Sequence, residues 1–146
     1  MLRRLAAVWV LATLGSGSIL RAQTLIVHVE NLRSTRGAIH LGFYDSPAQW
    51  DSRKSNFQRH RKKGVLVKDG RVTYTITDVA PGHYAMALAD DENDNGEIDW
   101  GLILPKEGFG FSGYASNRLR RPDFEEFDFV LREGETVEVV VVVRYL

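Results

Sequence analysis

The fold is decided by the run KDGRVTYTIT at residues 68–77. Asp69-Gly70 is a typical pair for a two-residue β-hairpin turn, because both central positions of a type I′ turn require a positive φ. After the pair, the apolar residues at 72, 74 and 76 alternate with three threonines. A period of two places the apolar side chains on one face of a strand, so the run predicts a tight turn followed by a half-buried strand.

The same alternation recurs on both sides of this run. It occurs at residues 25–30, 39–44, 65–67, 84–89, 127–131 and 137–143. Seven short strands separated by turns predict an all-β fold, a seven-stranded antiparallel β-sandwich. We expect the strands at 25–30 and 39–44 to pair as a hairpin.

Two segments do not follow the strand pattern. Ser46-Pro47 has the form of an N-cap followed by proline at the first helical position, and aromatic and basic residues follow at helical spacing, so we expect one short surface helix near 47–60. Residues 90–125 are rich in turn residues and contain no periodic segment. Such a long irregular loop is uncommon in a compact domain and is typically functional or mobile.

The N-terminus has the form of a signal peptide. Arg3 and Arg4 precede an apolar run at 5–14, a glycine and serine break follows, and Ala22-Gln23 ends the pattern as a cleavage site. The apolar run is shorter than the ~20 residues of a membrane-spanning helix. We therefore expect residues 1–22 to be a signal peptide, residues 23–146 to be one β-sandwich domain, and the mature protein to be periplasmic or extracellular with no transmembrane span.

Composition excludes several classes of function. The chain has no cysteine, which excludes thiol catalysis, cysteine-ligated zinc, iron–sulfur clusters and disulfides. It has 19 basic and 19 acidic residues, so no overall charge favours nucleic acid. Removal of Arg3, Arg4 and Arg21 with the signal peptide leaves 16 basic residues against 19 acidic ones, a formal charge of −3.

An acidic loop at residues 90–99 is the main candidate site. Its spacing matches the first nine positions of a calcium loop, whose oxygen ligands surround the ion at about 2.4 Å. The metal-ligand positions are Asp91, Asn93, Asn95, Glu97 through its carbonyl, and Asp99. Gly96 supplies the turn, but the twelfth position is Leu102 instead of a bidentate glutamate, so Glu107 is the candidate for the missing carboxylate. The alternative is that this loop only forms successive Asx-turns without an ion.

Three stretches and the opening strands resemble a family of exported bacterial proteins, the domain of unknown function 2141. The stretches are Ala80-Pro81-Gly82-His83-Tyr84, Asp91-Glu92-Asn93-Asp94-Asn95-Gly96-Glu97-Ile98-Asp99 and Pro105-Lys106-Glu107-Gly108-Phe109-Gly110-Phe111-Ser112. The resemblance covers nearly all of the mature chain and implies a cell-envelope β-sandwich of Ig-like or prealbumin-like shape. It implies no established activity, ligand or catalytic residue. The chain departs from the family pattern in its basic segment at 53–63 and at 100–104.

Other motifs carry weaker hypotheses. The run at 108–113 matches the dinucleotide fingerprint only by letters, because no βαβ unit surrounds it, and it fails the G-x-S-x-G pattern of hydrolases at its last position. His28 and His40 would face each other across the first hairpin, with Glu30 as a third zinc or copper ligand, although exposed sheet histidines are commoner. The basic segment at 53–63 favours either a solvated helix or contact with an anionic envelope surface.

These observations favour a non-enzymatic exported module. We expect it to bind an unknown protein partner or cell-envelope component through its irregular loops, with Ca²⁺ as the candidate cofactor. The alternative is a carbohydrate-binding module or glycan-acting enzyme that uses the 90–114 loop, since aromatic residues such as Trp100 and Tyr114 stack on sugars and paired carboxylates cleave glycosides. A third hypothesis gives the loop a purely structural role.

Overall fold

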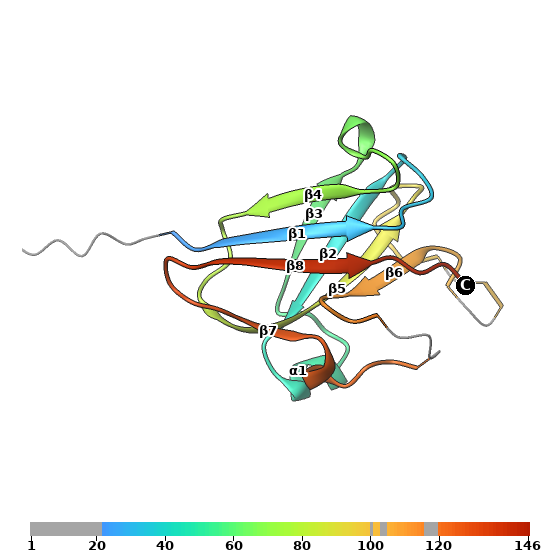
Figure 1. Ribbon diagram of the computed structural model, residues 1–146. Coiled ribbons are helices and arrows are strands. Elements are labelled where there is room, and N and C mark those ends of the chain that lie inside the picture. Colours follow the sequence, from blue (N-terminus) through green and yellow to red (C-terminus); the bar gives the residue numbers. More distant parts are fainter. Residues whose placement is uncertain (1–21, 100, 103–104, 116–119) are drawn as a thin grey trace, which may run out of the picture.

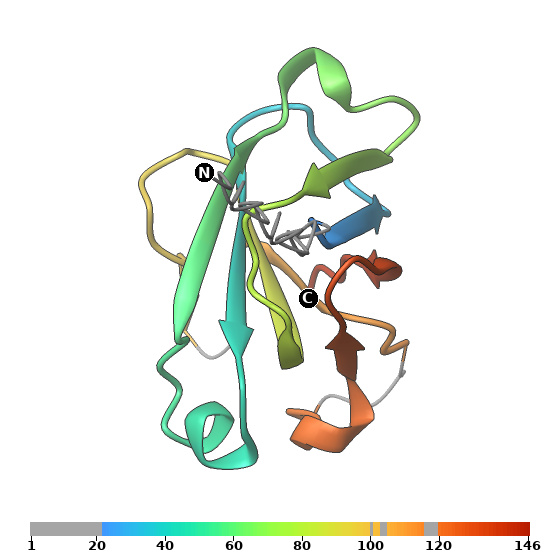
Figure 2. The same ribbon diagram turned by 90° about the vertical axis from the view of Figure 1, so that its left-hand side faces the viewer.

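The computed structural model describes residues 22–99, 101–102, 105–115 and 120–146, which form two β-sheets packed against each other (Figure 1). Figure 2 shows the two layers edge on, with the helix α1 (Pro47–Asp51) below the larger sheet. The described chain is therefore mostly β, with one short α-helix, as the sequence predicts. No helix within these residues is long and apolar enough to cross a membrane.

The smaller sheet has three strands in the order β4-β1-β8. The strands are β1 (Thr24–Glu30), β4 (Val72–Ile76) and β8 (Thr136–Val142). β1 pairs antiparallel with β4 and parallel with β8. The sandwich is thus not wholly antiparallel, and the described residues hold eight strands instead of the expected seven.

The larger sheet has five strands, four of them in the order β3-β2-β5-β6, with β7 also paired to β5. The strands are β2 (Ala38–Tyr44), β3 (Phe57–Lys62), β5 (Gly82–Asp91), β6 (Gly108–Phe111) and β7 (Asp128–Leu131). Two short 3₁₀ helices complete the described elements: η1 (Gly64–Leu66) and η2 (Phe124–Glu126). All pairings in this sheet are antiparallel.

The predicted hairpin between residues 25–30 and 39–44 is wrong, because β1 and β2 belong to different sheets. The connection leaves β1 through Asn31, whose φ is 65°, and Leu32 is buried against the core. The Leu32 N–H donates to the Gly70 carbonyl at 2.9 Å. A buried anchor in the connection therefore carries the chain across to the second sheet, which a polar turn would not do.

The predicted helix at 47–60 is also wrong beyond Asp51. Ser46 caps the helix by accepting from the Gln49 N–H, as expected, but the helix ends at Ser52. Phe57 instead opens β3 and stacks on Phe43 of β2, with ring centroids 4.6 Å apart. This core contact outweighs the helical spacing of the segment, because local propensity is weak against tertiary packing.

The Asp69-Gly70 turn is confirmed. Both residues have positive φ, 51° and 71°, and the backbones of Lys68 and Arg71 exchange two hydrogen bonds of 2.9 Å across the turn. The strand expected just before it is replaced by η1, so only the isolated Lys68–Arg71 bridge extends the hairpin on that side.

The main core lies between the sheets. It is formed by side chains from both layers, including Leu25 and Val27 of β1, Leu41 and Phe43 of β2, and Val141 of β8. These five side chains are completely buried. Burial of this kind is the main source of stability in a chain without disulfides.

β6 lies within the stretch 90–125 that the sequence predicts to be irregular. Two of its residues are glycine, which is unfavourable in strands, so no periodic signal marks it. A side chain at Gly110 would bring a Cβ to 2.6 Å from Val141 Cγ1, so the close approach of β8 explains this glycine. The backbones of Phe109 and Arg144 exchange hydrogen bonds of 3.0 and 2.8 Å, which join the two sheets along this side.

A second apolar cluster covers one end of the outer face of the larger sheet. Its buried members are Trp50, Ala85, Phe124 and Phe127. The Trp50 Nε1–H donates to the Pro122 carbonyl at 2.8 Å and holds α1 against the segment before η2. Among the described residues, no helix covers the rest of that outer face, and the candidate site lies there.

Candidate functional site: a groove beside the acidic loop

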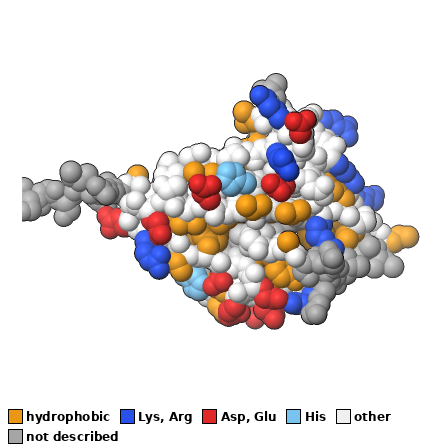
Figure 3. Space-filling view, in the orientation of Figure 1, with side chains coloured by type: hydrophobic (Ala, Val, Ile, Leu, Met, Phe, Trp, Pro, Cys, Tyr) orange, Lys and Arg blue, Asp and Glu red, His pale blue; other side chains and the backbone are white. Residues whose placement is uncertain are grey.

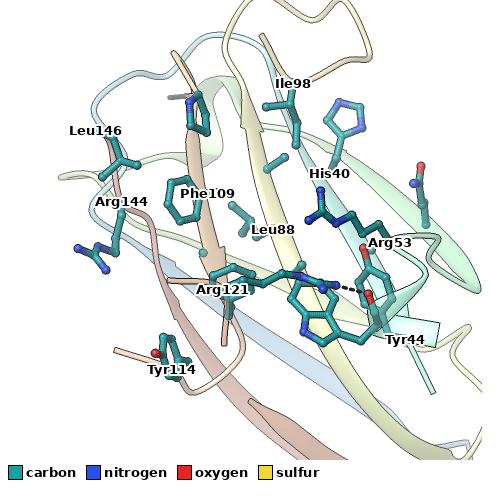
Figure 4. A pocket seen from close by; sticks show the side chains of 18 of the residues that line it. His40, Tyr44, Arg53, Leu88, Ile98, Phe109, Tyr114, Arg121, Arg144 and Leu146 are labelled. Atoms are coloured by element: carbon teal, nitrogen blue, oxygen red, sulfur yellow. Dashed lines mark hydrogen bonds between the residues drawn. The ribbon is translucent and has the colours of Figure 1, made fainter. Parts of the chain in front are cut away.

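A groove of about 720 Å³ lies on the outer face of the larger sheet (Figure 4). Its floor is low because the central strands carry small residues there: Gly42 on β2, and Ala87 and Ala89 on β5. Phe109 and Phe111 on β6 pair in register with the two alanines and form one side of the groove. Volumes of 300–1,000 Å³ with apolar and aromatic linings are typical of ligand sites.

One end of the groove is aromatic and cationic. The Arg121 guanidinium lies 3.5 Å from the centroid of the Trp50 ring and also donates to the Trp50 carbonyl. Tyr44 packs edge-on against the same ring at 4.8 Å. Burial and then the nearby charge of Arg53 lower the pKa of Arg121 below its ordinary value, so two cations share this end.

The acidic loop forms the opposite end. Gly96, Glu97 and Ile98 line the groove there together with Pro105. His40 on the groove floor shares a hydrogen bond of 2.9 Å between its Nε2 and Asp91 Oδ2. The first predicted metal-ligand residue is therefore tied directly to the groove.

Asp91 organises the turn of the loop. Its side chain is almost completely buried, and its Oδ1 accepts from the Asn95 N–H at 3.1 Å while Oδ2 accepts from the Gly96 N–H at 2.8 Å. Burial alone would raise the pKa of Asp91, but the hydrogen bonds from Gly96, His40 and Asn95 outweigh burial and lower it. The carboxylate is thus held in its charged form.

The other predicted metal-ligand side chains converge as well, apart from Glu97. Asn93 and Asn95 donate through their side-chain amides to Asp99, at 2.6 and 3.1 Å. Glu107 follows the acidic loop in the sequence, and its side chain is buried. It accepts hydrogen bonds from the backbone N–H groups of Glu92 at 3.0 Å and Asp99 at 3.1 Å. It therefore joins the two ends of the loop, where the sequence expects an outside carboxylate.

The groups that these residues could offer to a metal ion are all oxygen atoms, which suits Ca²⁺ better than a transition metal. In the structure the two asparagine oxygens accept from backbone N–H groups of the loop instead. However, no group of three or more His, Cys, Asp or Glu side chains that could hold a metal ion is found in the described part of the chain. The convergent amides are also what Asx-turns produce without an ion. Calcium binding therefore stays a prediction.

Mutual repulsion within the loop is reduced by cations that the sequence did not reveal. Asp90 is not available to the loop, because its Oδ1 is paired with the buried Nζ of Lys63 at 2.6 Å. The Tyr145 hydroxyl donates to Asp90 Oδ2 at 2.5 Å. Glu92 is paired with Arg33 at 2.5 Å, and this hydrogen bond lowers the pKa of Glu92.

The weaker sequence hypotheses fare differently. The zinc or copper site is wrong, because His28 and His40 lie on different sheets, and His28 instead contacts Glu138 at 2.8 Å. Ser112 is buried, donates to the Phe127 carbonyl and accepts from the Met86 N–H, which is a structural role. Trp100 lies outside the described residues.

Tyr114, the other aromatic residue of the carbohydrate hypothesis, does line the groove. Its hydroxyl is buried and has no hydrogen-bond partner among the residues that the structure describes.

The groove itself was not predicted from the sequence. Its residues come from α1, from five strands (β2, β3, β5, β6 and β8), from the acidic loop, and from the segments after α1, after β6, before η2 and after β8. Only the topology brings these together. The small residues at 85, 87 and 89 of β5 were the available signal, since three alanines on one face of a central strand leave space above it.

Comparison with known families identifies the class of protein. The sequence profile of DUF2141, described as uncharacterized protein conserved in bacteria, matches residues 27–139. The chain therefore belongs to this family. Comparisons with curated proteins and with solved structures find no match.

Proposed function

We propose that this protein is an exported, non-enzymatic module of Ig-like or prealbumin-like shape that binds a partner or cell-envelope component in the groove. The supporting observation is the groove itself, about 720 Å³ in volume, with a floor of small residues and aromatic sides. The signal-peptide pattern supports a periplasmic or extracellular location. Its test is the mass of the mature protein, which we expect to begin at Gln23.

The chemistry of the lining favours binding over catalysis. The serine of the hydrolase-like run is buried beneath the sheet surface, so its hydroxyl is not presented in the groove as a nucleophile. Aromatic and alanine side chains make up the centre of the groove. Phenylalanine and alanine side chains carry no titratable group, so this part of the groove is suited to binding apolar ligand parts by excluding water.

The experiment compares the exported protein with a variant whose groove is filled. Ala89→Leu adds a large side chain to the groove floor, while Thr75→Leu adds the same side chain on the exposed face of the other sheet. We expect the native protein and Thr75→Leu to sediment with an isolated bacterial envelope fraction. Much less of the Ala89→Leu variant should sediment with it. Equal sedimentation of all three proteins, or of none, would overturn the proposal.

Calcium binding at Asp91, Asn93, Asn95, Glu97 and Asp99 is a second proposal. It is supported by the position of the buried Glu107 carboxylate, which contacts the backbone at both ends of the loop. The ion would stiffen the loop wall of the groove.

The carbohydrate-binding or glycan-acting alternative is favoured by one observation, the place of Tyr114 in the groove lining. Its test is the same sedimentation experiment with purified envelope glycan in place of the whole envelope fraction. Retention of the native protein by glycan alone, abolished by Ala89→Leu and by Tyr114→Ala, would favour this alternative.

A further inference from the structure

We propose that the occupant of the groove is a free, single-chain amphiphile with an anionic head, such as a long-chain carboxylate, whose head lies between Arg53 and Arg121. The inference rests on the proposed function and names the ligand class of the same site.

The charge of the lining carries the first step. The described lining residues include four arginines, Arg53, Arg120, Arg121 and Arg144, but one acidic side chain, Glu97. Arg120 is already paired with Glu126 through two hydrogen bonds, of 2.7 and 2.5 Å. Glu97 belongs to the acidic loop and precedes Ile98, which Figure 4 shows away from Arg121. The lining is therefore complementary to an anion, and the positive charge best placed to bind the anion lies at the end with Arg53 and Arg121.

The end beside α1 is the head site. Arg121 is fixed over the Trp50 ring, and its nearest acidic partner is the exposed Asp51, 3.8 Å away. Arg53 lies close enough for its charge to disfavour the charged form of Arg121. An anion between the two guanidinium groups would remove that repulsion and accept charge-assisted hydrogen bonds from both.

The rest of the groove suits an apolar chain. The floor between the two ends consists of Gly42, Ala87 and Ala89, and Phe109 and Phe111 form a side. At the far end, Ile98 is 42% exposed and Leu146 is 44% exposed, and Figure 4 shows both at the edge of the groove. These exposed apolar side chains, away from Arg53 and Arg121, extend the path that a hydrocarbon chain would cover.

A free molecule fits this shape better than a membrane surface. The apolar floor is recessed between β6 and the loop wall, so a flat bilayer would not reach it. The opposite face of the protein, over β4, β1 and β8, carries both acidic and basic side chains (Figure 3).

The test is equilibrium titration of the exported protein, followed by calorimetry, with three amphiphiles of equal chain length below their micelle concentrations. The amphiphiles are dodecanoate, neutral dodecyl maltoside and cationic dodecyltrimethylammonium. We expect one dodecanoate per protein and at least about tenfold weaker binding of the other two, because each loses the charge-assisted contacts of the head.

Variants locate the site. We expect Arg53→Gln to weaken dodecanoate binding about tenfold and Ala89→Leu to abolish it. The matched controls are Arg71→Gln and Thr75→Leu on the other sheet, which should bind as the native protein does. Arg121→Gln is expected to act like Arg53→Gln. Arg53 is the decisive position because its side chain is exposed, whereas Arg121 also packs on the Trp50 ring.

The remaining outcomes overturn the inference in distinguishable ways. Equal binding of dodecyl maltoside would assign the site to a neutral or glycan ligand. Dodecanoate binding unaffected by Arg53→Gln and Ala89→Leu would place the amphiphile elsewhere. Salt-reversible binding to phosphatidylglycerol vesicles without dodecanoate binding would indicate a membrane surface. If dodecanoate does not bind while Ala89→Leu still abolishes envelope binding, the ligand class is wrong and the proposed function stands.

Discussion

Asp90 Oδ1 lies 2.6 Å from the Nζ of Lys63, and neither side chain is exposed to solvent. Lys63 follows β3 and Asp90 lies near the end of β5, so the pair spans the larger sheet beneath the acidic loop. Lys63 also donates to the Ser34 carbonyl at 3.0 Å, and Tyr145 donates to Asp90. The pair therefore joins the connection between the sheets, the loop and the C-terminal segment.

Removing one member of this pair should be strongly destabilising. Lys63→Met leaves the buried Asp90 carboxylate without its cation, and we expect a loss of about 3–5 kcal/mol in the free energy of unfolding. The double variant Lys63→Met/Asp90→Leu should recover most of that loss, because no buried charge remains unpaired. Urea denaturation of the two single variants, Lys63→Met and Asp90→Leu, and of the double variant measures these losses. If the loss in the double variant equals the sum of the two single losses, the charges do not interact.

Ser112 provides a second stability prediction. Its hydroxyl donates to the Phe127 carbonyl at 2.5 Å and accepts from the Met86 N–H at 3.1 Å. Ser112→Ala leaves both buried backbone groups without this partner, so we expect a loss of about 1–3 kcal/mol in unfolding free energy. Ser112→Thr keeps the hydroxyl and adds a methyl group, so it shows the effect of side-chain volume without removal of the hydrogen bonds. Unchanged denaturation of Ser112→Ala would show that these hydrogen bonds contribute nothing net.

Alkaline stability should depend on Tyr74. Burial, and then the negative charge of Asp90, raise the pKa of Tyr74 to about 12, whereas an unfolded tyrosine titrates near pH 10. Between those pH values the unfolded state has released a proton that the folded state retains. The contribution of this group is therefore complete below pH ~10 and is lost as pH rises towards ~12, by up to about 2.7 kcal/mol.

The measurement is the unfolding free energy of the native protein and of Tyr74→Phe across this pH range. The native protein should lose stability more steeply than the variant, by about 1.4 kcal/mol per pH unit. Parallel pH profiles for the two proteins would contradict the assignment to Tyr74.

Local signals in the sequence predicted local structure. Asp69-Gly70 was predicted to turn because its conformation depends on two adjacent residues, and Ser46-Pro47 started a helix for the same reason. Phe57 was assigned to that helix, but its stacking on Phe43 is a contact between segments, which spacing within one segment does not report.

In the candidate site, too, the local motif was predictable from the sequence but the contacts between distant segments were not. The order of oxygen ligands from Asp91 to Asp99 follows from a loop motif, and the sequence offers Glu107 as a candidate outside carboxylate. The pairing of Lys63 with Asp90 and the meeting of Arg53 with Arg121 depend on the order of strands in the larger sheet. Since the sequence wrongly placed β1 beside β2, those contacts and the groove were not predictable from it.

Calcium should stabilise the protein if the loop binds the ion. With a dissociation constant of ~0.1–1 mM, as in extracellular modules, Ca²⁺ at about ten times that value adds about 1.4 kcal/mol to the unfolding free energy. Thermal denaturation after EDTA treatment and then in millimolar Ca²⁺ should therefore show a Tm higher by a few degrees with the ion.

Asp99→Asn removes one carboxylate but keeps an oxygen able to accept from the two asparagine amides. This variant should lose most of the shift, whereas Glu97→Gln, whose exposed side chain is not needed as a ligand, should keep it. Equal Tm values with EDTA and with Ca²⁺ for the native protein would leave the loop with the structural role that its Asx-turns already explain.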